Sequence, residues 1–289
     1  MSGDVAFEKV NEVKASMDHI YNQPDPRAYF RELKKLNYRI PGSAKPIFQR
    51  LISHLRQRRN GTIHILDLGC SYGVNAALLK HGLSMPDLYK HWGQNNLSEA
   101  TPEEVVGYDQ RYFAELDESE DIEVIGLDQA ENAVVFAEEV GLLDEGLAVN
   151  LETEPLPEPV KEDLAAVDLV TSTGCIGYVT EKSFERLMPA VTQGRQPWLA
   201  NFVLRMFSFD AIEETLTDQG YVTEKLEGHT FVQRRFTSEQ EQERVVEKLR
   251  EQGLDTSREE NEGHLLAEFY LSRPAGDAAG VPVEQLVRA

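Results

Sequence analysis

The chain has 289 residues, and its 29 Lys and Arg against 50 Asp and Glu give a formal net charge of −21. Hydrophobic residues make up 41% of the chain, which supplies a large core and excludes global disorder. A surface this acidic repels phosphate backbones and anionic lipids, so we expect no nucleic-acid partner and no membrane partner.

The first sixty residues predict a helical cap. Their periodicity indicates an amphipathic helix over 5–20, a break at 23–26, a second helix over 28–36, a turn at 40–42 and a third helix over 43–58. Pro46 is expected in the first turn of the third helix, where its missing N–H costs little.

From residue 62 the pattern changes to strands that alternate with helices. Strands are expected over 62–68, 122–128, 146–150, 167–172 and 197–204, and helices over 74–80, 130–140, 182–191 and 210–219. This alternation predicts parallel βαβ units with helices on both faces of a sheet. Two further strands, 230–236 and 264–272, flank a charged helix over 239–252. The tail from Pro274 is expected to be loose.

A long insertion, 81–121, separates the first of these helices from the second strand. It is rich in acidic residues towards its end. An insertion of this length beside a sheet is typical of a lid or a surface ornament, and a solvated acidic excursion without a role stays open as the alternative.

A glycine-rich turn follows the first strand, where residues 67–73 read Asp-Leu-Gly-Cys-Ser-Tyr-Gly. Ligands of open parallel sheets bind beyond the carboxyl ends of the strands, where such a turn presents free N–H groups. Gly69 permits a positive φ and a close approach of the backbone to a ligand, and Gly73 lets the helix pack near the strand. Asp128 ends the second strand, where a carboxylate suits the two hydroxyls of a ribose.

These residues resemble those of the class I S-adenosylmethionine-dependent methyltransferases over about residues 63–272. In that family an acidic residue ends the first strand and a glycine-rich turn follows, as Asp67, Gly69 and Gly73 do here. The resemblance implies an α/β fold with a doubly wound, mainly parallel seven-stranded sheet whose last strand is antiparallel. It also implies S-adenosyl-L-methionine as the cofactor. We expect a helical lid at 1–60, a Rossmann-like domain at 61–273 and a loose tail at 274–289.

The resemblance also assigns roles to single residues. It implies that Asp128 binds the ribose, that Asn150 and Leu151 bracket the adenine, and that the loop 172–178 faces the methyl group. The full set of implied cofactor contacts is Asp67, Gly69, Ser71, Tyr72, Gly73, Asp128, Asn150, Leu151 and Thr173.

Two features depart from the family pattern. Ser71 replaces the middle glycine of the turn, and the insertion places Asp128 much further along the chain than the ~20 residues of dinucleotide folds. NAD is the alternative cofactor, but its G-x-G-x-x-G turn is absent. A carboxylate at Asp67 also suits a sulfonium that carries an ammonium better than it suits a pyrophosphate.

Methyl transfer is an in-line displacement, for which a protein supplies proximity and excludes water, and a base is needed only for a protonated nucleophile. Tyr178 is expected to face the sulfonium by a cation–π contact, and His19 is the expected imidazole base. Asn201, within an apolar strand, is expected to contact the substrate or to bridge two strands. The expected substrate-binding residues are Tyr21, Tyr38 and Arg205. Ordinary packing is the alternative for the aromatic residues, and an ion pair with Glu181 or Glu185 is the alternative for Arg205.

The remaining features bound the cellular setting. The chain opens without a signal-peptide pattern, and no window approaches the ~18 apolar residues of a membrane span. Cys70 and Cys175 are too few for a disulfide framework, and His and Cys do not cluster at metal-ligand spacing. We therefore expect a cytoplasmic protein without a metal, for which a homodimer is compatible with the charged helix.

Three functions remain in competition. The first is a methyltransferase acting on a small acceptor that is amino-acid-like or a natural-product intermediate. The second resembles azetidine-2-carboxylate synthases, in which the cofactor's own amine closes a four-membered ring and releases methylthioadenosine. The third is a binding or regulatory protein that keeps the fold without catalysis.

Overall fold

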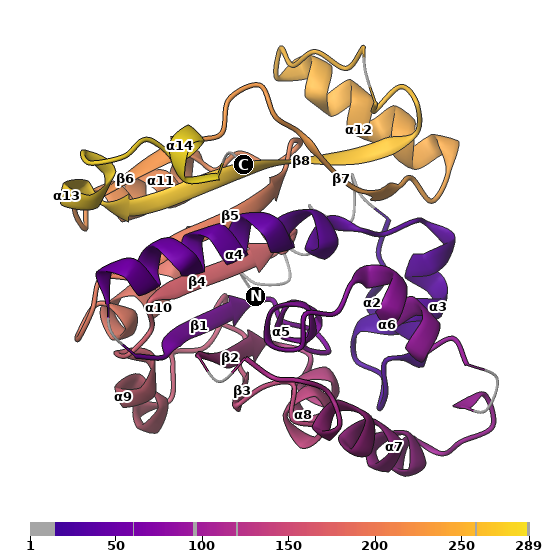
Figure 1. The fold of residues 1–289 in the computed structure, drawn as a ribbon. Coiled ribbons are helices and arrows are strands. Elements are labelled where there is room, and N and C mark those ends of the chain that lie inside the picture. The colour runs from indigo at the N-terminus through magenta and orange to yellow at the C-terminus, as the bar shows by residue number, and fades with distance from the viewer. Residues whose placement is uncertain (1–14, 60, 95–96, 120, 258, 288–289) are drawn as a thin grey trace.

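A computed structural model describes residues 15–59, 61–94, 97–119, 121–257 and 259–287. Its centre is an eight-stranded sheet with helices packed against it (Figure 1). The strands are β1 (Ile63–Leu68), β2 (Ile122–Asp128), β3 (Glu145–Ala148), β4 (Leu169–Thr173), β5 (Trp198–Leu204), β6 (Tyr221–Lys225), β7 (Phe231–Arg235) and β8 (His264–Pro274).

The strand order is β3-β2-β1-β4-β5-β8-β6, with β7 also paired to β8. The first five strands of this row are parallel, and β8 is antiparallel to both β5 and β6. The expected mainly parallel Rossmann-like sheet with an antiparallel strand near its end is therefore confirmed. The eighth strand arises because β6 and β7 share one edge, pairing with residues 270–274 and 264–267 of β8.

Helices connect the strands and pack on the sheet. They are α2 (Asp18–Tyr21), α3 (Arg27–Lys35), α4 (Ile40–Arg58), α5 (Val74–Lys80), α6 (Met85–His91), α7 (Pro102–Ala114), α8 (Glu131–Glu139), the 3₁₀ helix η2 (Glu158–Val160), α9 (Lys161–Leu164), α10 (Glu181–Val191), α11 (Asp210–Thr217), α12 (Glu239–Glu251), α13 (Ala275–Ala278) and α14 (Val283–Val287). Over the residues that the structure describes, none of these helices has the length and apolarity needed to cross a bilayer.

The two faces of the sheet carry separate apolar clusters. On β1, Ile63 and Ile65 belong to one cluster, whereas Leu66 and Leu68 belong to the other. Side chains alternate between the faces of a strand, so the two clusters lie on opposite sides of the sheet. The first includes α4, which contacts β1, β4 and β7, and the second includes α10 and α11. The molecule is thus a three-layer α/β structure.

The cap differs from expectation at the start of α4. This helix begins at Ile40 rather than at residue 43. Pro41 occupies its first turn, where the N–H that proline lacks would have no intrahelical acceptor. Pro46 therefore lies inside the helix rather than in its first turn. Of the helix expected over 5–20, residues 5–14 lie outside the described residues, and the described remainder holds α2.

The insertion is folded and packed. Capping boxes start both of its helices, with Ser84 and Asp87 at α6 and Thr101 and Glu104 at α7. Met85, Leu88, Trp92, Val105 and Phe113 of this segment are buried within the first cluster. The insertion is therefore an additional helical layer rather than a solvated excursion.

The C-terminal segment is ordered, against the expectation of a loose tail. Val283, Leu286 and Val287 of α14 are buried, and α14 lies against α4. The Arg50 guanidinium of α4 also donates a hydrogen bond to the carbonyl of Val287. Burial of these apolar side chains holds the C-terminal segment against α4, although its small residues and glycines predict a flexible segment.

Candidate active site

One cavity of about 360 Å³ lies beyond the carboxyl ends of the parallel strands. Four strand-end segments line it, namely 68–71 after β1, 127–130 after β2, 149–152 after β3 and 173–175 after β4. β1 lies between β2 and β4, so the order of strands reverses there. A parallel sheet binds ligands at this kind of switch point. The remaining walls come from the cap, the loop after β4 and β7.

The turn after β1 has an alternating left-handed backbone. Gly69, Ser71 and Gly73 have φ values of 74°, 49° and 72°. The backbone N–H of Gly69 donates to the carbonyl of Leu127 at 2.7 Å, which ties the turn to β2. A Cβ atom at Gly69 would lie 2.7 Å from the Cβ of Cys175, so only glycine fits between the loops after β1 and β4. Ser71 shares the positive φ of the two glycines, which is uncommon for a residue with a side chain.

Asp128 joins this turn to the end of β2. Its carboxylate accepts hydrogen bonds from the backbone N–H groups of Ser71, at 2.9 Å, and Ala130, at 3.0 Å. Burial raises the pKa of this carboxyl, and the backbone donors oppose that rise. A carboxylate has about four acceptor positions, so Asp128 retains capacity for hydroxyl donors on the cavity side. The carboxylate and the glycine turn therefore flank the same cavity.

The segment after β3 forms the adjoining wall. Asn150 accepts from the N–H of Glu152 at 3.0 Å and donates to Gln129 at 2.9 Å. The buried Glu152 carboxylate accepts from the Thr180 N–H and hydroxyl, both at 2.8 Å, and from the Ser183 hydroxyl at 2.6 Å. These bonds connect the loops after β3 and β4 across one side of the cavity.

Asp67 lies one layer behind the cavity wall. Its carboxylate accepts from Asn75 and from Thr171, each at 2.9 Å, and Asn75 also donates to the hydroxyl of Thr173 at 3.2 Å. Asn75 and Thr173 line the cavity, whereas Asp67 is 1% exposed. Burial, together with the negative charge of Asp128, raises the pKa of Asp67 to about 7.

Tyrosines of the cap and of the loop after β4 make one wall of the cavity, which we call the tyrosine wall. Tyr21, Tyr29, Tyr38 and Tyr178 all line the cavity. The ring centroids of Tyr21 and Tyr29 are 5.5 Å apart, and those of Tyr29 and Tyr38 are 6.3 Å apart. Burial raises the pKa of Tyr29 and Tyr38 well above the ordinary phenol value. These two phenols are therefore neutral at physiological pH and do not act as bases.

The cavity is electrostatically negative. Its described lining contains the carboxylates of Asp128 and Glu152 but no Lys, Arg or His. Asp67 adds a third carboxyl close behind. The site therefore favours cationic ligands over anionic ones.

The cap is fastened over the cavity at several points. The hydroxyl of Tyr72 accepts from the Gln23 N–H at 2.8 Å and donates to the Gln23 carbonyl at 2.9 Å. Asn22, which lines the cavity, accepts from the N–H of Asn132 on α8 at 2.9 Å. These contacts hold the segment that carries Tyr21 against the turn and α8.

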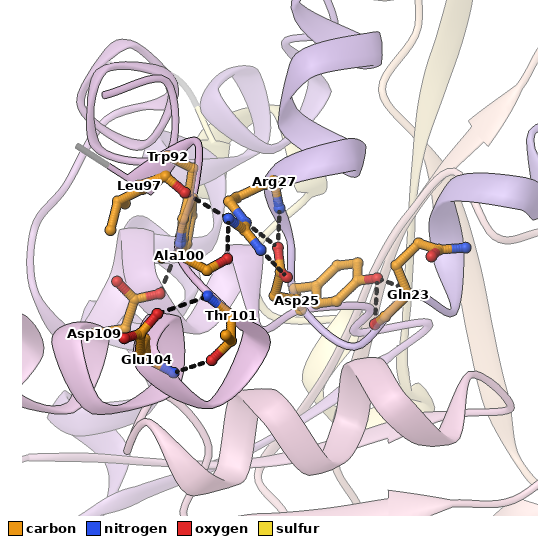
Figure 2. A network of polar contacts seen from close by, with 10 residues as sticks. Gln23, Asp25, Arg27, Trp92, Leu97, Ala100, Thr101, Glu104 and Asp109 are labelled. Atoms are coloured by element: carbon orange, nitrogen blue, oxygen red, sulfur yellow. Dashed lines mark hydrogen bonds and ion pairs between the residues drawn. The ribbon is translucent and has the colours of Figure 1, made fainter. Parts of the chain in front are cut away.

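Arg27 links the cap to the insertion (Figure 2). Its guanidinium binds both oxygens of Asp25 at 2.8 Å and donates to the carbonyls of Leu97 and Ala100. The adjoining α7 follows directly, with Thr101 as its N-cap. The insertion thus supports the cavity indirectly, by fixing the start of α3.

We expect Arg27→Met to destabilise the protein by about 2–3 kcal/mol, because the variant leaves Asp25 and two insertion carbonyls without their charged donor. Urea denaturation measures the change. Arg31→Met is the matched control, since Arg31 lies on the same helix with a side chain 66% exposed. Equal effects of the two substitutions would show that the link contributes nothing beyond surface charge.

The structure brings most of the sequence-predicted site residues together. Those that line the cavity are Gly69, Ser71, Asp128, Asn150, Leu151, Thr173, Tyr178, Tyr21 and Tyr38. Asp67 reaches it through Asn75, and Gly73 supports it as the N-cap of α5.

Four predicted residues lie away from the cavity. Tyr72 is fully buried and points to the cap rather than into the cleft. Asn201 accepts from the Ser172 hydroxyl at 2.8 Å and so bridges β5 to β4, which is the structural alternative predicted for it. His19 is exposed on the cap, and its carbonyl accepts from Gln23. Arg205 pairs with Glu260 and Glu268 rather than with either glutamate that was considered for it, and it does not line the cavity.

The cavity lining also includes Tyr29, Gln233 and Asn75, which were not among the predicted site residues. Tyr29 and Gln233 come from α3 and β7, which long-range packing brings to the strand ends, so no local pattern marks them. Asn75 carried a usable signal: it lies two residues after the turn, at the start of α5, where its polar side chain faces Asp67 of β1.

No family model matches the chain, and no curated protein matches it. The fold is similar to solved structures described as methyltransferases. The plantazolicin methyltransferase BpumL, in complex with SAH, is 13% identical, with a TM-score of 0.42 over 93% of this chain and 99% of that one. Magnesium protoporphyrin IX methyltransferase from Synechocystis, with bound SAM, is 11% identical, with a TM-score of 0.38 over 94% and 92% of the two chains. A SAM-dependent methyltransferase from Aquifex aeolicus is 13% identical, with a TM-score of 0.36 over 85% and 97%.

Proposed function

We propose that the protein is an S-adenosylmethionine-dependent methyltransferase that acts on a small-molecule acceptor. The observation that carries this proposal is the cavity that the glycine turn and Asp128 line together. The two are joined by the 2.9 Å hydrogen bond from the Ser71 N–H to the Asp128 carboxylate. This pairing suits a nucleoside, because the turn admits a close ligand and the carboxylate accepts from ribose hydroxyls.

The charge of the cavity favours this cofactor over a dinucleotide. A sulfonium and an ammonium are attracted to a lining with two carboxylates and with no cation among its described residues, whereas a pyrophosphate is repelled. Asp128 would hold the ribose, and the segment 149–151 would adjoin the adenine. The tyrosine wall would face the sulfonium, where aromatic rings attract a cation.

The bound cofactor would supply a methyl group already activated for displacement. The protein itself then contributes by positioning the two reactants and by excluding water from the cavity. The cap, which is held in place by hydrogen bonds to Tyr72 and Asn132, carries three of the four tyrosines of this wall and would limit the access of water to the cavity. Tyr29 and Tyr38 remain protonated, so each orients the acceptor as a hydrogen-bond partner rather than removing its proton. The acceptor would therefore be a group that is nucleophilic without first losing a proton to a strong base of the protein.

Isothermal titration tests the proposal. S-adenosylhomocysteine and S-adenosylmethionine should bind to the purified protein, and NAD should not. Absence of binding by both sulfur ligands would contradict the proposal. Binding without any turnover of S-adenosylmethionine, with or without acceptors, would favour a binding protein with the same fold.

A second candidate is the intramolecular reaction of the same cofactor, which yields azetidine-2-carboxylate and methylthioadenosine. The cavity of about 360 Å³ lies towards the lower end of small-molecule pockets, ~300–1,000 Å³, and the intramolecular reaction needs room for the cofactor alone. Incubation with S-adenosylmethionine alone separates the two. Stoichiometric methylthioadenosine release without an acceptor supports cyclisation, and an inert cofactor that turns over only with an acceptor supports methylation.

A further inference from the structure

Gln233 enters the cavity through an irregularity in β7. The register of β7 against β8 shifts between Val232 and Arg234, so the pairing passes over Gln233. Its carbonyl accepts instead from the N–H of Arg39, at 2.8 Å, next to the start of α4. A bulge of this kind re-aims a side chain, and here the side chain of Gln233 lines the cavity.

The side-chain oxygen of Gln233 is an acceptor without a donor. Gln233 is 4% exposed, and its Oε1 atom is buried with no hydrogen-bond partner among the described residues. Its Nε2 atom lies 2.3 Å from the position that a Cβ on Gly174 would occupy, so the amide is pressed against the loop after β4. Gly174 has a φ of 88°, and glycine there permits this approach. A buried, unpaired acceptor is costly, and a donor supplied by a ligand or an ordered water offsets that cost.

The surroundings of this oxygen define the donor that fits. Tyr21, Tyr29, Tyr38 and Tyr178 line the same cavity, and tyrosine rings attract cations. The lining carboxylates give the cavity a negative field, unopposed by any described lining cation. A group that carries N–H donors and a positive charge satisfies the acceptor, the aromatic wall and the field together.

We propose that Gln233 and the tyrosine wall form a subsite for an alkylammonium group, with Gln233 Oε1 accepting one of its N–H donors. This inference rests on the proposed function, in which two sources of this chemistry exist. One is the amine of the acceptor, and the other is the amino-acid tail of the cofactor itself. Gln233 is then a specificity-determining residue of the reaction.

The test compares two ligands that differ in the amino-acid tail. S-adenosylhomocysteine has the ammonium, and 5′-methylthioadenosine lacks it. If the cofactor's tail occupies the subsite, Gln233→Leu weakens the binding of S-adenosylhomocysteine about tenfold, because about one hydrogen bond to a charged group is lost. The affinity for methylthioadenosine stays unchanged. Gln233→Glu keeps an acceptor and should restore the preference for the ligand with the ammonium.

If the acceptor's amine occupies the subsite, Gln233→Leu leaves both adenosine ligands unchanged. In that case n-propylamine, followed by NMR with and without S-adenosylhomocysteine, binds the wild-type protein in preference to n-propanol. Gln233→Leu then abolishes this preference, and Gln233→Glu retains it.

A matched substitution, Gln129→Leu, removes an exposed amide from the cavity wall beside Asp128 and should not change the ratio of the two adenosine affinities. The inference is overturned if Gln233→Leu alters neither that ratio nor propylamine binding, or if it weakens both adenosine ligands equally. Failure of the proposed function has a separate signature, because the wild-type protein then binds neither adenosine ligand. The propylamine titration of the ligand-free protein still decides the subsite.

Discussion

Asp128→Asn is expected to weaken S-adenosylhomocysteine binding by about 100-fold if, as proposed, the carboxylate binds the ribose, because the amide loses the charge and one of the two acceptor oxygens. Hydrogen bonds to a charged group contribute about 1.5–3 kcal/mol each, so one or two of them account for this loss. The carboxylate also accepts hydrogen bonds from the N–H groups of Ser71 and Ala130. Asn is preferred to Ala for this test because an amide of the same shape preserves the turn better. Isothermal titration measures the change.

The ribose is common to several ligands, which gives this prediction an internal check. Methylthioadenosine should lose affinity by the same factor as S-adenosylhomocysteine, unlike the pattern expected at Gln233. Glu131→Gln is the control: this exposed acidic residue starts α8 and does not line the cavity. Affinity within threefold of wild type for Asp128→Asn, in a variant with an unchanged melting temperature, would exclude the ribose role.

The sequence predicted the half of the site that local pattern determines. Alternating strands and helices give the order of the sheet, and the turn at 67–73 must lie at the carboxyl end of β1. Asp128 ends the neighbouring strand, so its approach to the turn follows from parallel pairing alone. The structure joins them at 2.9 Å through the Ser71 N–H.

Side-chain direction accounts for two of the predicted residues that lie away from the cavity. Asn201 has the same parity as Leu199 and Val203, which belong to the second apolar cluster, so strand alternation directs it into that face and next to Ser172. Tyr72 lies in the turn, but its ring packs 5.5 Å from Tyr29 of the cap. The cap position is set by tertiary contacts that no local period encodes.

The part of the cavity that Tyr29 and Gln233 line could not be predicted either, because it depends on tertiary packing. Tyr29 and Gln233 lie about 200 residues apart in sequence and meet the cavity only when α3 and β7 are assembled around β4. The tail shows the converse case. Its glycines and small residues favour a loose segment, yet three apolar side chains of α14 suffice to dock it on α4.

Asp67→Asn is expected to remove a pH dependence of stability that the wild-type protein shows between pH 5.5 and pH 8. Burial raises the pKa of this carboxyl from 3.8 to about 7 in the folded protein. The folded state therefore holds a proton that the unfolded state releases near pH 4. This contribution to stability is full below that pH and is lost as the pH rises through about 7.

The size of this effect follows from the pKa. Between pH 5.5 and pH 8 the wild-type protein should lose about 2 kcal/mol through this group, since each unit of pH below the folded pKa is worth about 1.4 kcal/mol. Asn is neutral throughout, so the stability of Asp67→Asn relative to wild type should rise by that amount across the range. Urea denaturation in this range also avoids the isoelectric point near 4.7.

Binding of the cofactor should lower the pKa of Asp67 and release its proton. A cationic ligand in the cavity stabilises the charged form of Asp67, whose pKa the neighbouring Asp128 charge also raises. Titration of S-adenosylmethionine near pH 6.5, in buffers of different ionisation enthalpy, should therefore show release of up to one proton. Asp67→Asn should bind without that release, whereas Glu131→Gln should keep it. Proton release that survives in Asp67→Asn would assign the titration to another group and would leave Asp67 as a structural partner of Asn75 and Thr171.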